Sequence, residues 1–431
     1  MTMNRARRLL LGMGLLGATG PLLAAPPRRL DRELAAIAAD PACELASLSV
    51  LAIRAGQVSY AYQSGRRFIG HDGLPDKPVG PDTLFRIASI SKMMTTLGLM
   101  RLLEDGKVSL DADVSGHLGF TLRNPHFPDQ SITLRHLLTH TSSLRDDAGY
   151  SWGADVALKD VIDSRMFAVN AGPGAYFTYC NLGWGIIGTV MERVTGERFD
   201  RLMRRLLIEP LGLQAGYLPS ELPPKALTNL ATLYRKRTVD TEVWDAIGPW
   251  IAQVDDYSVK PPAVLDRYVI GTNATPFSPT GGLRISARDM GIVMRMLMGQ
   301  GMQLLKPATL SLMFSRQWTF DGRNGDTSDG LFHCWGLGNE QFPDETGTPL
   351  VEGGGFPAVG HLGDAYGLMS VFAFDPKRRN GMIVLVGGTS TDPFASVNKG
   401  KYSSLARFQE RILTALYWGA IAPKRVPNNS A

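Results

Sequence analysis

The sequence predicts an α/β fold of the α+β type, in which an antiparallel sheet flanked by helices carries an inserted all-α lobe. Strand-like stretches occur near both ends of the chain, at 47–64 and 366–386. Helical periodicity dominates between them, and an amphipathic helix is expected at 403–418. With 431 residues, 44% of them hydrophobic, the chain can bury a large core and form more than one lobe.

The first part of the sheet is expected soon after the start of the chain. Residues 30–39 have the apolar spacing of a helix. Residues 47–54 and 59–64 then alternate like the two strands of a hairpin that turns at Gly56.

A buried helix is expected to begin near Ser89 and to end at Gly106, the residue type best suited to a left-handed cap. Between Lys92 and Arg101 its only polar side chains belong to two threonines. A helix that is apolar on nearly every face is buried rather than exposed on a surface.

Helices dominate the middle of the chain. Residues 239–279 show no clear period and are expected to form an ordered surface excursion. Helices are expected at 133–140, 182–194 and 199–208, the last of which ends before Pro210.

The end of the chain returns to the sheet. Ser286 and Asp289 have the spacing of a capping box at the start of a helix that runs to Met298. Strands are expected at 366–374 and 382–386.

This order of elements divides the chain into two lobes. We expect a discontinuous, sheet-containing α/β lobe made of residues 26–88 and 285–425, and a mainly helical lobe made of residues 89–284. Ser89 then lies at the junction of the two lobes.

Residues 1–25 have the pattern of an export signal. Three arginines precede an apolar run that begins at Leu9, contains Gly and Pro, and is too short to anchor a protein in a membrane. The Arg7-Arg8 pair leaves a twin-arginine signal open beside an ordinary secretory signal. We therefore expect an exported protein, either periplasmic or secreted.

Charge and hydropathy limit the kinds of partner that the protein is expected to have. Without residues 1–25 the formal net charge falls from +5 to +2, and no run of lysine and arginine indicates nucleic acid. No later run of about 20 apolar residues predicts a membrane span. We expect a small-molecule or peptide substrate as the partner, and the oligomeric state stays open.

The three cysteines, Cys43, Cys180 and Cys334, fit no zinc motif. A bridge between Cys43 and Cys334 and three separate thiols are both compatible with their spacing.

The first turn of the buried helix carries chemistry. Ser89 and Lys92 are three residues apart, so their side chains share one face of the helix. Burial and the positive end of the helix both disfavour a charged amine there. A neutral amine beside a serine hydroxyl makes that serine an activated nucleophile.

Two further motifs support this hypothesis, because an isolated S-x-x-K pattern is weak. Tyr179 and Asn181 form Y-x-N just before a helix, and His361 and Gly363 form H-x-G leading into a strand. In this order the three motifs resemble the serine β-lactamase and penicillin-binding-protein superfamily, in its class C and esterase branch, which includes D-aminopeptidase-like relatives. The stretches ITLRHLLTHTSSL, PGAYFTYCNLGWGIIGTVMERVTG and SPTGGLRISARDM carry the same likeness.

The resemblance implies a β-lactamase/transpeptidase-like fold and catalysis with no metal or organic cofactor. It implies Ser89 as nucleophile, Lys92 as its base, and Tyr179 as the residue that passes the proton to the leaving group. A Tyr179 phenolate is accessible only if the charge of Lys92 lowers its pKa. Asn181 is expected to hydrogen-bond Lys92 and a substrate amide.

The same resemblance assigns the residues around the substrate. The backbone N–H groups of Ser89 and Asp364 are expected to form the oxyanion hole. Gly363 lets its strand approach the substrate closely. Gly281 and Gly282 are expected to bind substrate.

The third motif departs from the family pattern. Where a lysine and a hydroxyl residue usually hold a substrate carboxylate, this chain has His361 and Leu362, followed by Asp364. A mostly neutral imidazole, a leucine and an acid bind an anion poorly. This favours esters, amides or peptides without a carboxylate at that point. Cys180 and Ser143 are smaller departures, at positions where serine and glycine are usual.

Simpler interpretations apply to other candidates. His136 and His140 have the spacing of a metal pair but lack a third ligand, so we interpret them as structural. Cys180 has no evident base that would make it a nucleophile. Asp146 and Asp147 are interpreted as a solvated loop. An α/β-hydrolase triad is unsupported, and Gly353-Gly354-Gly355 lacks the lysine and the preceding strand of a phosphate loop.

The sequence therefore predicts an exported serine hydrolase that works through an acyl-Ser89 intermediate. An esterase or peptidase is the first expectation, and a β-lactamase or D,D-carboxypeptidase is the second. A penicillin-type sensor that stays acylated, or a binding module, is the non-enzymatic alternative.

Overall fold

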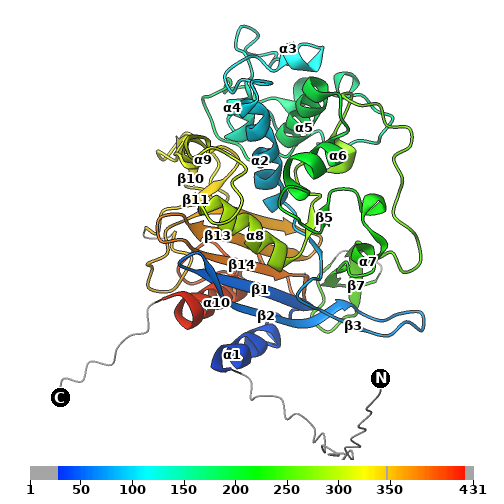
Figure 1. The fold of residues 1–431 in the computed structure, drawn as a ribbon, viewed down its shortest axis with the longest axis vertical. Coiled ribbons are helices and arrows are strands. Elements are labelled where there is room, and N and C mark those ends of the chain that lie inside the picture. Colours follow the sequence, from blue (N-terminus) through cyan, green and yellow to red (C-terminus); the bar gives the residue numbers. More distant parts are fainter. Residues whose placement is uncertain (1–27, 240, 242, 346–347, 423–431) are drawn as a thin grey trace, which may run out of the picture.

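The computed structural model describes residues 28–239, 241, 243–345 and 348–422, so the expected export signal at 1–25 lies outside the described residues. A nine-stranded antiparallel sheet forms the base of the molecule in the order β3-β2-β1-β14-β13-β12-β11-β10-β9 (Figure 1). Its strands are β1 Ser47–Arg54, β2 Gln57–Phe68, β3 Lys77–Pro78, β9 Trp318–Thr319, β10 Cys334–Trp335, β11 Glu340–Phe342, β12 Ala358–Ala365, β13 Leu368–Asp375 and β14 Asn380–Val386.

The two ends of the chain meet in the middle of this sheet, as the sequence predicts. β1 pairs with its hairpin partner β2 on one side and with β14 on the other, where Leu48 lies opposite Val386 and Ile53 opposite Gly381. Both β1 and β14 are buried along almost their whole length.

Each face of the central strands packs into a separate core, because successive side chains of a strand point to opposite faces. Leu51 and Ile383 join the larger core, which includes residues of α2 and α8. Val50 and Val384 join a second core with α1 and α10. The helices nearest the central strands are α1 Arg29–Ala38, α8 Ala287–Leu297 and α10 Arg407–Leu416.

A group of helices lies at one end of the sheet, at the top of Figure 1. α2 and α5 pack together at its centre, and both are buried on almost every side. The helices there are α2 Ile90–Glu104, α3 Ser115–Leu118, α4 Leu134–Leu138, α5 Leu182–Thr195 and α6 Phe199–Met203; α7 Pro224–Leu227 and α9 Pro307–Phe314 lie elsewhere.

Short strands also occur where the sequence shows no strand signal. Three two-residue strands form the sheet β4-β8-β5, and a second small sheet has the order β15-β6-β7. Because two residues carry no periodicity, only their partners decide that they pair. The bounds are β4 Phe85–Arg86, β5 Ala215–Gly216, β6 Leu233–Lys236, β7 Trp250–Val254, β8 Arg284–Ile285 and β15 Gly388–Thr389.

The excursion expected at 239–279 contains β7, which pairs with β6. Two sequence expectations need correction. The strand expected from Tyr366 begins at Leu368, because Tyr366 has a φ of +57° and belongs to the turn after β12. The helix expected from Ser403 begins at Arg407, because the backbone N–H groups of 401–403 bind the Glu410 carboxylate instead of continuing a helix.

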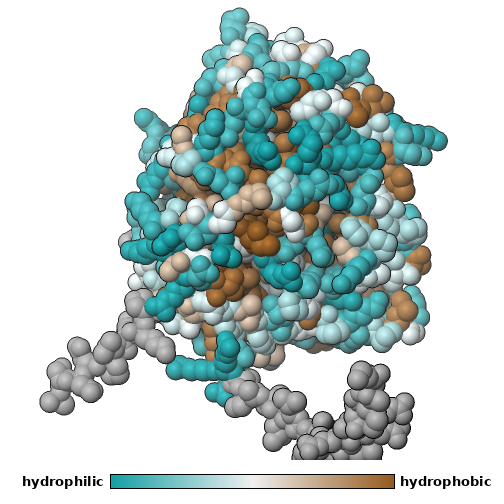
Figure 2. All heavy atoms as spheres, viewed as in Figure 1, coloured by the Kyte–Doolittle hydropathy of each residue, from teal (hydrophilic) through white to brown (hydrophobic). Residues whose placement is uncertain are grey.

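Cys43, Cys180 and Cys334 are separate, buried thiols, so the bridge between Cys43 and Cys334 does not form. Within the described residues, no helix has the length and apolar character that a membrane crossing requires. Figure 2 shows polar and apolar residues interspersed over the visible face, with apolar atoms gathered in several small groups. Scattered apolar groups of this kind are ordinary on a folded protein.

Candidate active site

Ser89 lies between β4, a strand of the sheet β4-β8-β5, and the first turn of α2. β4 ends at Arg86, and Ala88 then takes a φ of +46°. A left-handed alanine costs about 1–2 kcal/mol, so this sharp turn is maintained by its surroundings. It presents Ser89 at the N-cap of α2, beside a pocket.

Lys92 follows one turn later and is fully buried. Its Nζ lies 2.9 Å from Ser89 Oγ, 2.7 Å from Asn181 Oδ1 and 3.2 Å from the carbonyl oxygen of Thr280. A neutral amine has two hydrogens and one lone pair. It can therefore donate to Asn181 and Thr280 while accepting the hydrogen of the Ser89 hydroxyl.

The electrostatics favour that neutral form. Burial lowers the pKa of Lys92 from its ordinary value of 10.5 to about 7, and the nearby Asp146 and Cys180 oppose this shift. An amine with this pKa is a competent base at neutral pH.

The Asn181 amide is fixed on both sides. Its Oδ1 accepts from Lys92 and from Thr280 Oγ1, the latter at 2.8 Å. Its Nδ2 donates to Asp146 Oδ2 at 2.9 Å. The expected bond to Lys92 is therefore present, and one amide hydrogen is already used by a protein carboxylate.

Asp146 is part of the site rather than a solvated residue, which corrects the sequence interpretation. Its carboxylate accepts from the backbone N–H groups of Asn181 and Leu182 at the start of α5, at 2.8 to 3.0 Å. It also accepts from the Cys180 thiol at 3.3 Å. Asp147, one residue later, is exposed and pairs with Arg145.

The loop that carries Asp146 needs two left-handed residues. His140 has a φ of +57° and Ser143 a φ of +65°. Glycine adopts that conformation without steric cost, which accounts for a glycine preference at the position of Ser143.

Tyr179 is partly buried in an aromatic cluster and also lines the pocket. Its ring stacks on His140 at 4.3 Å and on Phe332 at 5.2 Å between centroids. Burial raises the pKa of Tyr179, and the nearby Ser89 hydroxyl only partly opposes this effect. Lys92 is not among the groups that lower the pKa of Tyr179, so the condition for an accessible phenolate is not met. Tyr179 is a neutral phenol.

Both histidines of the site are neutral. Burial lowers the pKa of His361 to about 3, and the charge of Lys92 contributes to this shift. Its Nδ1 lies 2.6 Å from the carbonyl oxygen of Leu362, which assigns the proton to Nδ1. His140 Nδ1 accepts from the backbone N–H of Cys180 at 2.9 Å. His136 Nδ1 faces a different group, the backbone N–H of Thr133, so the two histidines do not form a metal pair.

β12 forms the opposite wall. β13 covers one edge of β12 over residues 359–365, whereas β11 pairs with the opposite edge only at 358–360. From residue 361 onward that second edge is left to border the pocket. A side chain at Gly363 would lie 2.5 Å from the Ile87 carbonyl oxygen and 2.4 Å from Ser370 Oγ. Only a glycine lets the strand approach the turn before Ser89 this closely.

Asp364 follows Gly363 on this wall. Its side chain is open to the pocket but has protein on most sides, and this burial raises its pKa to about 6 against the influence of Arg235. In the part of the chain that the structure describes, its carboxylate has no hydrogen bond or ion pair.

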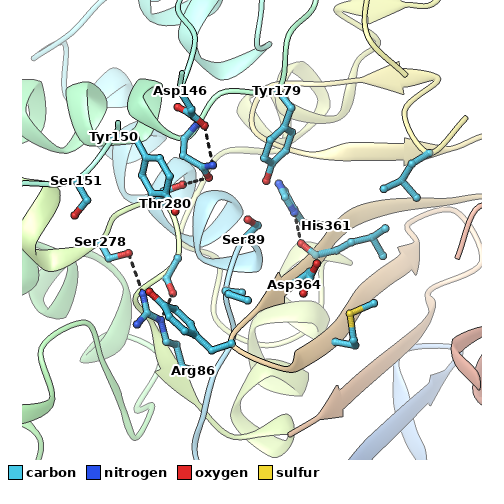
Figure 3. Close-up of a pocket in the computed structure, with 18 of the residues that line it drawn as sticks. Arg86, Ser89, Asp146, Tyr150, Ser151, Tyr179, Ser278, Thr280, His361 and Asp364 are labelled. Atoms are coloured by element: carbon cyan, nitrogen blue, oxygen red, sulfur yellow. Dashed lines mark hydrogen bonds between the residues drawn. The ribbon is translucent and has the colours of Figure 1, made fainter. Parts of the chain in front are cut away.

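The pocket has a volume of about 720 Å³. Ser89, Tyr179 and His361, from three different elements, point toward one another in it (Figure 3). Arg86 also lines the pocket, where its Nε donates to the Gly281 carbonyl oxygen at 2.9 Å and its guanidinium lies 4.8 Å from the centroid of the Tyr366 ring.

The structure thus brings together every motif residue that the sequence singles out. Gly281 lines the pocket, whereas Gly282 is not among its lining residues and its backbone N–H donates to the Ser278 carbonyl oxygen. The sequence reasoning missed four residues that shape the site: Arg86, His140, Asp146 and Thr280. Only His140 and Thr280 stand in stretches whose family likeness could have drawn attention to them.

Comparison with known proteins agrees with the family that the sequence motifs resemble. A profile of the Beta-lactamase family matches residues 32–406. Esterase EstB of Burkholderia gladioli is 31% identical over 185 residues, which cover 39% of this chain and 46% of the esterase. The chain thus spans less than half the length of the curated relatives it matches.

Two solved structures show the fold over almost the whole chain. The D-amino acid amidase from Ochrobactrum anthropi SV3, complexed with D-phenylalanine, is 21% identical with a TM-score of 0.61, covering 90% of this chain and 98% of the amidase. A class C beta lactamase from Rhodobacter sphaeroides is 19% identical with a TM-score of 0.61, covering 90% and 97%. With a family profile matched over most of its length, this chain belongs to the Beta-lactamase family.

Proposed function

We propose that this protein is a serine hydrolase that transfers an acyl group from an ester or amide to Ser89 and then to water. One observation carries the proposal. The fully buried Lys92 amine lies 2.9 Å from Ser89 Oγ, and its pKa is lowered to about 7. A dry, neutral amine in contact with a hydroxyl is the arrangement that activates a serine.

In the proposed first step, Ser89 Oγ forms a bond to the substrate carbonyl carbon while its proton moves to Lys92 Nζ. The backbone N–H groups of Ser89 and Asp364 hold the resulting oxyanion. The bond to the leaving group then breaks. The Tyr179 phenol gives its proton to the leaving group, and the proton on Lys92 replaces it.

Water completes the reaction by the same route in reverse. Lys92, neutral again, accepts a proton from the water that attacks the acyl carbon. The Ser89–acyl bond breaks, and Ser89 Oγ recovers its hydrogen. No group outside this set of residues is required for the proton balance.

The charges of the pocket support substrates without a carboxylate next to the third motif. His361 is neutral, Leu362 is apolar, and Asp364 is an unpaired acid. A substrate carboxylate placed there would lose hydration and meet an acid. The names of the esterase relative and of the amidase with the same fold agree with this substrate class.

A β-lactamase or D,D-carboxypeptidase is the second candidate, and Arg86 is the observation that favours it. Its guanidinium lines the same pocket and is a suitable partner for a substrate carboxylate. Two of its nitrogens already face the Gly281 carbonyl oxygen and Ser278 Oγ, and it lies over Tyr366. These contacts make it less available to a substrate.

Hydrolysis rates distinguish the two candidates. We expect faster turnover of a short p-nitrophenyl ester than of nitrocefin, with no turnover of either by Ser89→Ala. The reverse ranking would establish the second candidate. His361→Lys restores a cation to the third motif, so it is expected to raise nitrocefin turnover relative to ester turnover.

A sensor that stays acylated is separated from an enzyme by mass spectrometry of the intact protein. An enzyme shows a transient acyl adduct on Ser89 and releases product repeatedly, whereas a sensor keeps a stable adduct after one equivalent. A binding module shows neither adduct nor product.

We also propose export, on the pattern of residues 1–25 alone. N-terminal sequencing of the protein recovered from a secreting host tests this. A mature chain that still begins at Met1 would contradict it.

A further inference from the structure

We propose that Asp146 is a positioning residue for Lys92: its carboxylate fixes the Asn181 amide so that Oδ1, and not Nδ2, faces the lysine amine. The inference rests on the proposed function, because it assigns Lys92 as the base for Ser89. It adds a residue outside the three motifs to the working parts of the site.

The contacts of Asp146 leave the Asn181 amide one orientation. Asp146 Oδ2 accepts from Asn181 Nδ2 at 2.9 Å and from the Asn181 backbone N–H at 2.8 Å. Its Oδ1 accepts from the Leu182 backbone N–H at 3.0 Å. An ionised carboxylate only accepts hydrogen bonds, so the Asn181 group that faces it must be the NH₂.

This orientation has a consequence on the opposite side of the amide. Asn181 Oδ1 is then the group that faces Lys92 Nζ, at 2.7 Å, and it also accepts from Thr280 Oγ1. The amine donates to Oδ1 and to the Thr280 carbonyl oxygen. Its lone pair is left for the Ser89 hydroxyl.

A flipped amide would block the base. With Nδ2 toward Lys92, the amide would donate to the amine and occupy the lone pair that Ser89 needs. It would also remove an acceptor from the protonated amine. The carboxylate of Asp146 makes this flip unfavourable, because Oδ1 would then face Oδ2 at hydrogen-bond distance.

Asp146 also acts on Lys92 through its charge. Around the amine, His140, His361 and the Tyr179 phenol are neutral, and burial keeps the Cys180 thiol protonated. Asp146 is the acid whose charge raises the pKa of Lys92. It therefore keeps the pKa of the base from falling further below neutrality.

The first test is Asp146→Asn, with Asp147→Asn as the matched control. An asparagine at 146 must place its NH₂ group either toward the Asn181 side chain or toward the backbone N–H groups at the start of α5. In both orientations two donors face each other, which disturbs the position of the Asn181 amide. We expect kcat for a p-nitrophenyl ester to fall about 100-fold, as for loss of a positioned proton transfer. Asp147 is exposed, and its variant should match the wild type.

A reciprocal exchange separates positioning from helix capping. In Asp146→Asn/Asn181→Asp the carboxylate faces Lys92, and the new amide donates to it from position 146. We expect at least tenfold recovery over Asp146→Asn, with the rising limb of the pH profile moved to higher pH by direct contact between Asp and Lys92. A structural cap alone predicts no recovery and no such movement.

A measurement without catalysis keeps this inference distinct from the proposed function. NMR titration of ¹³Cε-labelled lysine, with the Lys92 signal assigned by its loss in Lys92→Met, reports the pKa of the amine directly. We expect a lower pKa in Asp146→Asn and a higher one in the exchanged pair. An unchanged pKa in both variants overturns the inference, even if the ester is hydrolysed. If the two variants show these pKa shifts but the wild type hydrolyses no ester, the proposed function is refuted instead.

Discussion

Replacing Lys92 should lower the activity and make the stability rise less steeply with pH above neutral pH, because the buried amine is needed as the base but is unfavourable to bury. Lys92→Met keeps the length and volume of the side chain but removes the amine. Without a base for Ser89, acylation should fall by about 10²–10⁴-fold. Lys92→Arg is the control for charge, since a guanidinium stays protonated and is expected to be equally inactive.

The pKa of Lys92 sets the size of the pH effect. With a pKa of about 7 the amine is deprotonated in about 10% of molecules at pH 6 and about 90% at pH 8. We therefore expect kcat/KM for a neutral ester to rise about tenfold between these values, following a single ionisation. A flat profile, or one that rises only above pH 9, would refute the assignment of Lys92 as the base.

Stability gives a second readout. Between pH 7 and 10.5 the unfolded chain holds a proton on Lys92 that the folded protein has released. The free energy of unfolding therefore rises with pH, by about 1.4 kcal/mol per pH unit from this residue. Chemical denaturation of the wild type and Lys92→Met at pH 7.5 and 9.5 should show this difference in slope. Parallel slopes would mean that the amine is not desolvated.

Three further predictions concern the walls of the pocket. Tyr179→Phe keeps the stacking on His140 but removes the acid for the leaving group, so hydrolysis of an alkyl ester should fall more than that of a p-nitrophenyl ester; equal losses would contradict this role. Gly363→Ala places a Cβ 2.5 Å from the Ile87 carbonyl oxygen, so kcat should fall at least tenfold as the strand moves away, and an unchanged kcat would contradict the close approach. Burial raises the pKa of the Glu340 carboxyl, so as pH rises above about 4.5 the unfolded chain loses this proton before the folded protein does, and the free energy of unfolding falls. Glu340→Gln should therefore raise Tm at pH 8 but not at pH 4. An unchanged Tm at pH 8 would mean that the carboxyl is ionised in the folded protein.

The sequence was sufficient for elements whose pattern is local. The apolar runs of β1 and β14 and the continuous apolar surface of α2 predict those elements within a few residues, because burial on both faces leaves a strong signal. Two-residue strands such as β4 and β8 have no such pattern, since their pairing is decided by chain segments that are far apart in sequence.

The difference between local patterns and distant contacts also explains which site residues the sequence could identify. Ser89, Lys92, Tyr179 and Asn181 are found from short motifs because their spacing is local. Asp146 shows no pattern of its own, and its role follows from contacts across space with the start of α5. Its position next to the exposed Asp147 makes the pair resemble an ordinary polar loop.

The neutral state of Tyr179 could not be predicted from the motif either. Its protonation depends on the combined burial by His140, Phe332 and Trp335, which come from three distant parts of the chain. The number of protein atoms around the phenol, rather than its spacing from Asn181, decides its pKa.

The meeting of β1 and β14 has a consequence for the order in which a ribosome delivers this protein. β1 emerges with one edge covered by β2 and the other edge open until β14 has been synthesised. An uncovered edge invites pairing with other chains, so the nascent protein is most prone to aggregate late in its synthesis. Interrupted translation before β12 yields a polypeptide that has Ser89 and Lys92 but lacks the wall that we propose holds the oxyanion. Such a fragment should be inert toward acylating reagents, and catalytic competence begins only when the final strands are in place.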